Sequence, residues 1–126
     1  MSTGNASPSG IRRGEVYDAR LDPVEGSEQG GTRPVVVVSR NAINEASDVL
    51  LIVPCTSYRR QRVYRSQVIL AAPDGGLTVD SVAMGEQVRT LSKSRIVRRC
   101  GLLSSRSVAQ IERALMIALG LSRFHA

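Results

Sequence analysis

Histidine is nearly absent from this chain of 126 residues, and its scarcity limits the chemistry that the chain can perform. The single histidine, His125, is the next-to-last residue, so no imidazole is placed to activate a serine or cysteine nucleophile. The carboxylates do not cluster at the spacing of metal ligands, although Glu28, Asp80 and Glu86 could converge in space. A metal nuclease therefore stays an alternative, but we expect no metal and no cofactor.

Cysteines and long apolar runs are also scarce. The two cysteines, Cys55 and Cys100, have no recognisable spacing, which predicts buried, reduced thiols rather than a disulfide or a metal site. No apolar run approaches the roughly 20 residues of a membrane span. Residues 1–10 lack the apolar segment of a signal peptide. These absences predict a soluble, cytoplasmic protein that does not contact a membrane.

Lysine is replaced almost entirely by arginine: the chain has sixteen arginines, one lysine and a net charge of +6. The planar guanidinium group presents a fork of donors that suits phosphate, and it stacks on bases. GC-rich coding sequence also favours arginine, and basic surfaces are common. The composition thus favours nucleic acid as the partner without establishing it.

The chain fits one domain, residues 11–126, behind a polar tail of residues 1–10 that we expect to be disordered. Apolar or alternating segments between turn residues predict strands at 15–21, 34–39, 49–56, 67–71, 79–84, 87–91 and 98–102. Residues 41–47 fit a helical turn or a loop, and residues 58–65 predict a hairpin loop. We therefore expect a mainly β fold, a small antiparallel, barrel-like sheet.

A helix is predicted at the end of the chain. Ser107 and Gln110 have the spacing of a capping box at its start. An apolar stripe at helical spacing follows, made of Val108, Ile111, Leu115, Ala118 and Leu119. We expect this stripe to cover an open face of the sheet or to pair with a second subunit.

The junction of Arg33 and Pro34 is the most informative local feature. A polar, glycine-rich loop, residues 22–32, runs directly into a strand of valines, and proline suits the first residue of a strand. Arg33 is then the last loop residue before a rigid element, and Glu28 stands upstream in the same loop. We expect Arg33 to bind an anion, with a surface ion pair to Glu28 as the alternative.

Arginine, glutamate, threonine and serine suit a reaction in which the substrate supplies its own nucleophile. RNA does so, because its 2′-hydroxyl can attack the adjacent phosphate, and the protein then moves protons and stabilises the charge on phosphorus. Arg33 can hold the phosphate, Thr56 can donate to it, and Glu28 can act as base or orient Arg33. No step requires a metal. The alternative for Thr56 is a hydrogen bond within its own turn.

Five segments, in this order, resemble the MazF/PemK family of toxins. They are Arg13–Val16, Leu21–Pro23, residues 26–39 (GSEQGGTRPVVVVS), residues 53–57 (VPCTS) and residues 86–96 (EQVRTLSKSRI). The resemblance covers residues 11–121 and implies an SH3-like, CcdB/PemK-like fold and a homodimer. It also implies sequence-selective, metal-independent cleavage of single-stranded RNA to 2′,3′-cyclic phosphate and 5′-hydroxyl ends. A cognate MazE-like antitoxin, which we expect to be acidic, would block the RNA groove.

The resemblance implies residue roles by position. The family's catalytic arginine falls on Arg33, its catalytic threonine on Thr56 and its supporting acid on Glu28. The positions beside the scissile phosphate, in base pockets or on the groove floor are Ser27, Gln29, Ser57, Glu86, Gln87 and Arg89. Some relatives carry histidine where this chain has Ser27 and arginine where it has Met84, so catalytic roles for those groups do not transfer.

Residues 58–65, YRRQRVYR, combine arginine and tyrosine as surfaces for single-stranded nucleic acid do. We expect Arg59, Arg60 and Arg62 to contact RNA, and a mobile, solvated loop is the alternative. Two other functions fit: a CcdB-like inhibitor that binds DNA gyrase without catalysis, and a nucleic-acid-binding module. The pattern of Arg33 and Thr56 favours cleavage over both.

Overall fold

The computed structural model of the protein describes residues 10–121, so residues 1–9 of the expected tail and His125 lie outside the described part. The strands are β1 (Glu15–Arg20), β2 (Thr32–Val37), β3 (Val49–Ser57), β4 (Gln67–Leu70), β5 (Ser81–Met84), β6 (Arg89–Ser92) and β7 (Ile96–Leu102). The helices are α1 (Asn41–Ala46) and α2 (Ser105–Leu119), with single 3₁₀ turns η1 (Asp74–Gly76), η2 (Gly85–Gln87) and η3 (Lys93–Arg95).

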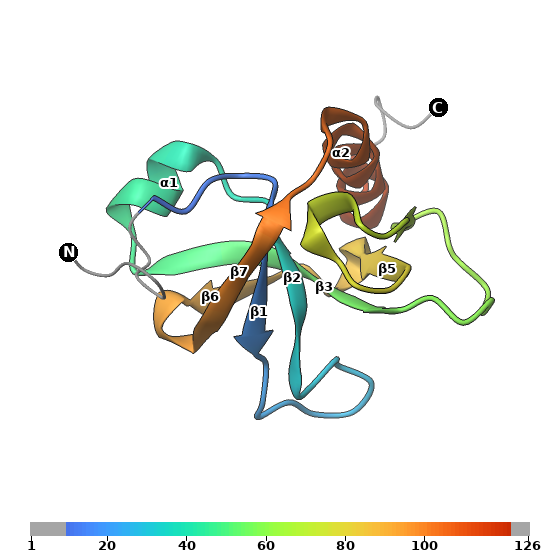
Figure 1. Cartoon of the computed structure of the whole chain (residues 1–126), viewed down its shortest axis with the longest axis horizontal. Helices are drawn as coiled ribbons and strands as arrows, with labels where there is room; N and C mark the ends of the chain where they lie inside the picture. Colours follow the sequence, from blue (N-terminus) through green and yellow to red (C-terminus); the bar gives the residue numbers. More distant parts are fainter. Residues whose placement is uncertain (1–9, 122–126) are drawn as a thin grey trace.

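The strands form one antiparallel sheet in the order β4-β5-β3-β2-β1-β7, with β6 also paired to β3 (Figure 1). β3 reaches both parts of the sheet, because Val49–Ile52 pairs with β6 and Cys55–Ser57 pairs with β5. Within residues 10–121, β4 and β7 do not pair with each other, so the sheet stays open instead of closing into a barrel. The predicted antiparallel β fold with a C-terminal helix is confirmed.

The valine run of β2 fills two hydrophobic clusters on opposite faces of the sheet. Val36 packs on the face that α2 covers, in one cluster with Ile111 and Ala114. Val35 and Val37 pack on the other face, in a second cluster. Neighbouring strand residues point to opposite faces, and each fully buried valine stabilises the fold by roughly 1.5–3 kcal/mol. β2 is therefore a rigid support for the residues at its ends.

α2 begins three residues earlier than the capping box predicted. Its N-cap is Ser104, whose hydroxyl accepts the Ser107 N–H at 3.2 Å. The Ser107 hydroxyl instead donates to the Asp74 carboxylate of η1, and Ser107 itself lies in the first turn of α2. Burial tends to raise the pKa of Asp74, but the hydrogen bonds from both serines outweigh burial and lower it. Asp74 therefore ties η1 to the start of α2.

The predicted apolar stripe of α2 is only partly buried. Ile111 and Ala114 are in the core, whereas Ala118 and Leu119 near the C-terminal end are exposed. Ala118 and Leu119 therefore do not pack in the core, and the alternative that this part of the stripe pairs with a second subunit stays a prediction. Within residues 10–121, no helix is both long enough and apolar enough to cross a membrane.

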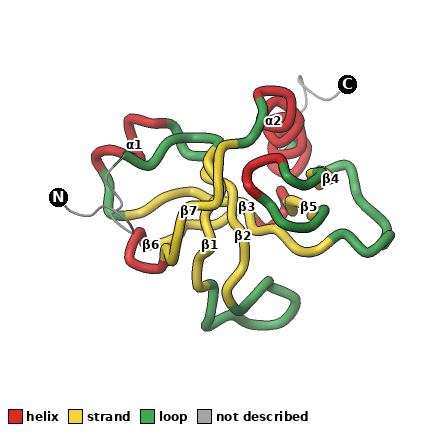
Figure 2. The backbone as a smooth tube through the Cα atoms, in the orientation of Figure 1, coloured by secondary structure: helices red, strands yellow, loops and turns green. Residues whose placement is uncertain are grey.

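The long connections leave the sheet at two places (Figure 2). The first, residues 21–31, joins β1 to β2. The second contains residues 58–65, and it is not the predicted hairpin loop, because β5 lies between β3 and β4 in the sheet. Residues 41–46, which the sequence left undecided, form the helix α1.

Both cysteines are free thiols, as the sequence predicted. Cys55 lies in the core, where burial raises its pKa to about 12. Cys100 on β7 is only half-buried, and burial is again the main reason that its pKa is raised. The expectation that both thiols are fully buried therefore holds for Cys55 alone.

Candidate active site

Arg33 and Thr56 meet at the end of the β2–β3 ladder. The last registered pair of this ladder joins Val35 to Pro54, and continuing the antiparallel register by two residues places Arg33 opposite Thr56. The Arg33 Nη1 atom lies 3.5 Å from the Thr56 Oγ1 atom. Both side chains are half-buried, so the guanidinium group and the hydroxyl meet at the protein surface.

Arg33 is the second residue of β2, so the prediction that it ends the loop is wrong. It pairs with Ala19 of β1, since the β1–β2 ladder extends beyond Pro34. The strand fixes the backbone of Arg33 and the loop fixes its side chain: Arg33 Nε donates to the Gly30 carbonyl at 2.8 Å. This bond leaves the two Nη nitrogens available to a ligand.

Two glycines allow the loop to fold back towards Arg33. Gly31 has a positive φ of 74°, which favours glycine, and its carbonyl accepts the Leu21 N–H at 2.8 Å at the base of the loop. A β-carbon on Gly30 would lie 2.5 Å from the Asp22 carboxylate oxygen. The carbonyl that orients Arg33 therefore depends on this glycine pair, which the sequence marked only as flexible.

Glu28 lies in the same loop and is exposed. Its Oε1 atom accepts the Glu25 N–H at 3.0 Å, and its own N–H donates to the Glu25 carbonyl at 3.2 Å. None of the ion pairs between residues 10 and 121 includes Glu28 or Arg33. The alternative that these two residues form a surface ion pair is therefore wrong.

A cavity of about 370 Å³ lies between this loop and the segment from η2 to β6. Its lining residues are Glu28, Gln29, Glu86, Gln87, Val88 and Arg89. Gln87 links the two walls, because its Oε1 atom accepts the Gln29 N–H at 2.9 Å and its Nε2 atom lies 3.5 Å from the Ser27 carbonyl. We call this space the loop cavity. Five of the predicted site residues line the loop cavity, whereas Arg33 and Thr56 do not.

Arg89 and Glu86 have structural contacts in addition to lining the loop cavity. Arg89 Nη1 donates to the Leu21 carbonyl at 3.4 Å. The Glu86 carboxylate accepts from Ser66 Oγ at 3.2 Å and from Gln67 Nε2 at 2.7 Å, so it fixes the start of β4. Each of these residues therefore has a fixed backbone and an oriented side chain at the cavity wall.

The arginines of residues 58–65 follow Thr56 in the connection between β3 and β4. Arg59, Arg60 and Arg62 are exposed, and the Arg62 guanidinium group stacks 4.9 Å from the centre of the Tyr64 ring. Gln61, which the sequence analysis did not single out, donates through Nε2 to the Ser57 carbonyl at 3.1 Å. Nothing in the sequence marks Gln61, since the contact depends on how the loop folds back on β3.

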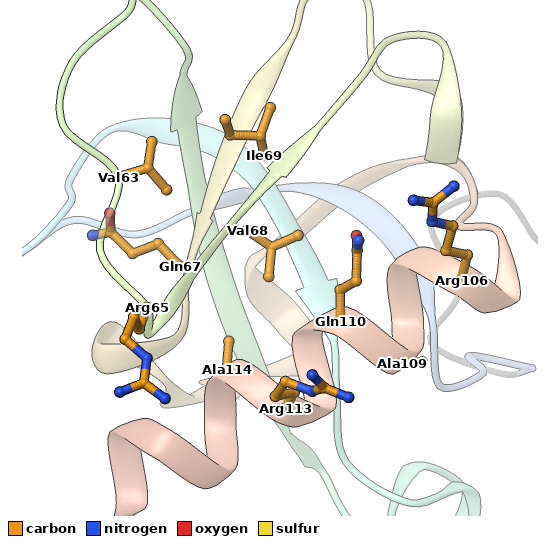
Figure 3. Close-up of a pocket in the computed structure, with 10 residues that line it drawn as sticks. All are labelled: Val63, Arg65, Gln67, Val68, Ile69, Arg106, Ala109, Gln110, Arg113 and Ala114. Atoms are coloured by element: carbon orange, nitrogen blue, oxygen red, sulfur yellow. The ribbon is translucent and has the colours of Figure 1, made fainter. Parts of the chain in front are cut away.

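A groove with a larger volume, about 630 Å³, lies elsewhere, between β4 and α2 (Figure 3). Arg65, Arg106 and Arg113 surround a floor that includes Val68 and Ala114, and none of the ion pairs between residues 10 and 121 includes these arginines. We call it the helix groove. It contains none of the predicted site residues, so its size does not make it the reactive centre.

The three carboxylates that could have formed a metal site do not come together. No group of three or more histidine, cysteine, aspartate or glutamate side chains between residues 10 and 121 is arranged to hold a metal ion. Glu28 and Glu86 line the loop cavity, whereas the Asp80 carboxylate accepts the Ala72 N–H at 2.9 Å. The possibility, considered from the sequence, that these three carboxylates converge on one site is therefore wrong.

Similar proteins share this fold, and the matches cover most of the length of this chain. A curated protein named Endoribonuclease MazF, from Staphylococcus epidermidis, is 39% identical over 114 residues, which cover 90% of this chain and 95% of that protein. The crystal structure of MazF from Deinococcus radiodurans has a TM-score of 0.75 at 28% identity, covering 87% of this chain and 96% of that one.

A further solved structure is an endoribonuclease from a mycobacterial species in complex with its cognate antitoxin. It has a TM-score of 0.74 at 27% identity, and the match covers 89% of this chain and 97% of that one. Residues 12–119 match the family model described as the PemK-like, MazF-like toxin of type II toxin–antitoxin systems. This chain belongs to that toxin family.

Proposed function

We propose that the Arg33–Thr56 contact is where this protein, the endoribonuclease toxin of a toxin–antitoxin system, cleaves single-stranded RNA. The 2′-hydroxyl attacks the adjacent phosphate, and the products carry a 2′,3′-cyclic phosphate and a 5′-hydroxyl. The observation that carries the proposal is the 3.5 Å separation of Arg33 Nη1 from Thr56 Oγ1. A single phosphate oxygen can accept hydrogen bonds from both groups.

Arg33 stabilises the negative charge that develops on phosphorus. Its Nε–H is held by the Gly30 carbonyl, so the Nη nitrogens are oriented before the substrate arrives. Donors fixed in advance stabilise a transition state more than mobile donors do, because they do not reorganise during the reaction. Thr56 on β3 adds a neutral hydroxyl donor to the same phosphate.

The reaction balances with one bond formed and one broken. The 2′ oxygen forms a bond to phosphorus as the bond from phosphorus to the 5′ oxygen breaks. Glu28 takes the proton of the 2′-hydroxyl, and solvent water supplies the proton that the 5′ oxygen needs. Glu28 suits this role because its carboxylate is exposed and free of an arginine partner within residues 10–121.

RNA on either side of the cut extends over the neighbouring loops. Ser27, Gln29 and Ser57 stand next to Glu28, Gly30 and Thr56 in the chain and contact the nucleotides at the cut. The exposed Arg59, Arg60 and Arg62 bind phosphates further along. The Tyr64 ring, already stacked on Arg62, offers a surface for a base. Glu86, Gln87 and Arg89 line the loop cavity beside this path.

The partners follow from the toxin family and from charge. The mycobacterial relative was solved with its cognate antitoxin, and the Deinococcus radiodurans toxin was solved as a MazE–MazF complex. We propose that a MazE-like antitoxin controls this protein in the cytoplasm, and that it is acidic because the toxin has a net charge of +6. The helix groove, with three arginines around an aliphatic floor, suits an acidic antitoxin segment.

We also propose that the protein acts as a homodimer. The edge strand β4 exposes Ile69, the end of α2 exposes Leu119, and Leu121 after the C-cap is exposed as well. Exposed apolar side chains on a sheet edge favour association with another chain. Sedimentation equilibrium of the purified protein should give twice the mass of the chain, and a monomer at all concentrations would contradict the dimer.

The experiment incubates the purified protein with a long RNA in excess EDTA and maps the new ends. Cleavage at defined sites is expected, with 2′,3′-cyclic phosphates on the upstream fragments and 5′-hydroxyls on the downstream fragments. A requirement for added divalent metal, or 5′-phosphate ends, would contradict the proposal. A gyrase supercoiling assay with excess protein tests the alternative of a gyrase inhibitor, and supercoiling should be unaffected.

A further inference from the structure

Arg95, in the 3₁₀ turn η3, directs its side chain at the base of the loop between β1 and β2. Its Nη1 atom donates to the Arg20 carbonyl at 3.3 Å and also to the Asp22 carbonyl. In return, Arg20 Nη2 donates to the Ser94 carbonyl, next to Arg95, at 3.0 Å. None of the ion pairs within residues 10–121 includes either arginine. The donors of Arg95 therefore hold the main chain of the loop rather than a carboxylate.

These contacts begin where the pairing of β1 with β7 ends. The last registered pair of that ladder joins Ala19 to Ile96. Beyond this pair, the guanidinium group of Arg95 supplies the donor that the backbone of a longer strand would supply. Arginine suits this task because its planar group carries several donors in a fixed geometry. Arg95 thus extends the attachment of β1 into the first residues of the loop.

Asp22 connects this attachment to Arg33. A β-carbon placed on Gly30 would lie 2.5 Å from the Asp22 carboxylate oxygen and 2.9 Å from Val24 Cγ2, so both side chains lie directly against Gly30. The Gly30 carbonyl accepts the hydrogen bond from Arg33 Nε at 2.8 Å. A short series of contacts therefore runs from Arg95 through Asp22 and Gly30 to the guanidinium group of Arg33.

We propose that Arg95 is a positioning residue for RNA cleavage, which fixes the carbonyl that orients Arg33 and does not itself bind RNA. This inference rests on the proposed function, in which Arg33 stabilises the charge on the phosphate. Gln87 holds the loop on the Gln29 side, and Arg95 holds it on the Asp22 side. Without Arg95 the Gly30 carbonyl shifts, and a displacement of roughly 1 Å in a catalytic group can lower a rate by about 10²-fold.

The first test is Arg95→Met, which keeps the aliphatic part of the side chain and removes the guanidinium group. In single-turnover cleavage of a labelled RNA in EDTA, the rate at saturating protein should fall about tenfold to a hundredfold. RNA affinity and its dependence on salt should be unchanged. Arg98→Met is the matched control, because Arg98 is exposed on β7 and contacts Asp18 rather than the loop. Weaker RNA binding with an unchanged saturating rate would show that Arg95 binds a phosphate, and would overturn the proposal.

The second test repeats Arg95→Met in the Arg33→Lys background. Lysine has no donor at the position of Nε, so the Gly30 carbonyl no longer orients this side chain, and Arg95→Met should slow Arg33→Lys by less than about twofold. Equal slowing in both backgrounds would overturn the proposal and leave the proposed function intact. Full activity of Arg33→Lys, or no cleavage by the unmodified protein, would refute the proposed function and this inference with it.

The orientation of Arg33 can also be measured without RNA. In the ¹⁵N–¹H spectrum of the arginine side chains, the Arg33 Nε–H signal is the one that Arg33→Lys lacks. Because the Gly30 carbonyl accepts this N–H, its exchange with water should be slow in the unmodified protein and in Arg98→Met. Arg95→Met should lose the slow exchange while urea denaturation shows a folded protein. An Arg33 Nε–H that exchanges equally slowly in Arg95→Met would overturn the proposal.

Discussion

Replacing Arg33 by lysine is the most informative single change, because it keeps the positive charge and removes the fork of donors. In the structure, Arg33 Nε is held by the Gly30 carbonyl at 2.8 Å while Nη1 points at Thr56 Oγ1. Lysine has no donor at the position of Nε, so its ammonium group is not fixed by the loop. It can offer one of the two hydrogen bonds that the guanidinium group offers to a phosphate.

The size of the effect follows from the hydrogen bonds that are lost. Hydrogen bonds to charged groups are worth about 1.5–3 kcal/mol each. Loss of one bond in Arg33→Lys predicts a cleavage rate about 10–100-fold lower, and loss of both in Arg33→Ala predicts about 10²–10⁴-fold, at roughly 1.4 kcal/mol for each factor of ten. RNA affinity should change less than the rate, since the bonds strengthen as charge develops on the phosphate.

The assay is single-turnover cleavage of a labelled RNA in EDTA, with the protein in excess and with stability measured by urea denaturation. Arg40→Ala is the matched control, because it removes an exposed arginine just before α1, outside the cleft. It should cleave at the rate of the unmodified protein. The reasoning is refuted if folded Arg33→Lys cleaves within twofold of the unmodified protein, or if Arg40→Ala loses as much activity.

Three further changes test other parts of the account. Thr56→Val keeps the shape and removes the hydroxyl, so the cleavage rate should fall about 10²-fold with an unchanged urea midpoint. Arg62→Ala should flatten the dependence of RNA affinity on salt by about one phosphate contact, and an unchanged slope in filter binding would show that Arg62 does not touch RNA. Asp74→Ala should lower the free energy of unfolding by about 2 kcal/mol at neutral pH. The lowered pKa of Asp74 means that its contribution is present above the ordinary value of 3.8 and is lost as the pH falls through the lower folded value, so the two urea midpoints should converge in acid.

The helix groove makes a separate prediction about the antitoxin. Reversing the charge with Arg106→Glu and Arg113→Glu should weaken binding of the acidic antitoxin in calorimetry and leave RNA cleavage unchanged, because neither residue lines the loop cavity or the Arg33–Thr56 contact. Unchanged antitoxin affinity would show that the acidic segment binds elsewhere.

Local features of the sequence predicted the strands, and they predicted that the side chains of Arg33 and Thr56 come together. The valine run of β2 is buried on both faces of the sheet, so its apolar character alone was sufficient to predict a strand. The approach of Arg33 to Thr56 follows from the antiparallel register of two strands whose boundaries the sequence placed within two residues. The sequence analysis began β2 at Pro34 and so missed its exact start. A strand can begin before a proline when the residues that precede the proline pair with a neighbouring strand, as they do here with β1.

Contacts between distant segments were not predictable in the same way. The hydrogen bond from Gln29 to Gln87 joins residues that are 58 positions apart, and no periodic pattern in the sequence indicates it. The capping box at Ser107 failed because Ser104 caps α2, and Asp74, which lies about 30 positions upstream of both serines, accepts hydrogen bonds from both hydroxyls. The insertion of β5 between β3 and β4 likewise joins distant segments, since Cys55–Ser57 pairs with Ser81–Ala83, and local propensity does not describe such a pairing.

The most direct measurement is cleavage of an RNA oligonucleotide that carries one 2′-deoxy nucleotide immediately 5′ to a mapped cut. The account predicts that this single change abolishes cleavage at that bond, while the same change one nucleotide further upstream is tolerated. Cleavage of the deoxy bond at an undiminished rate would mean that the nucleophile comes from water or the protein, and the role given to Arg33 and Thr56 would be wrong.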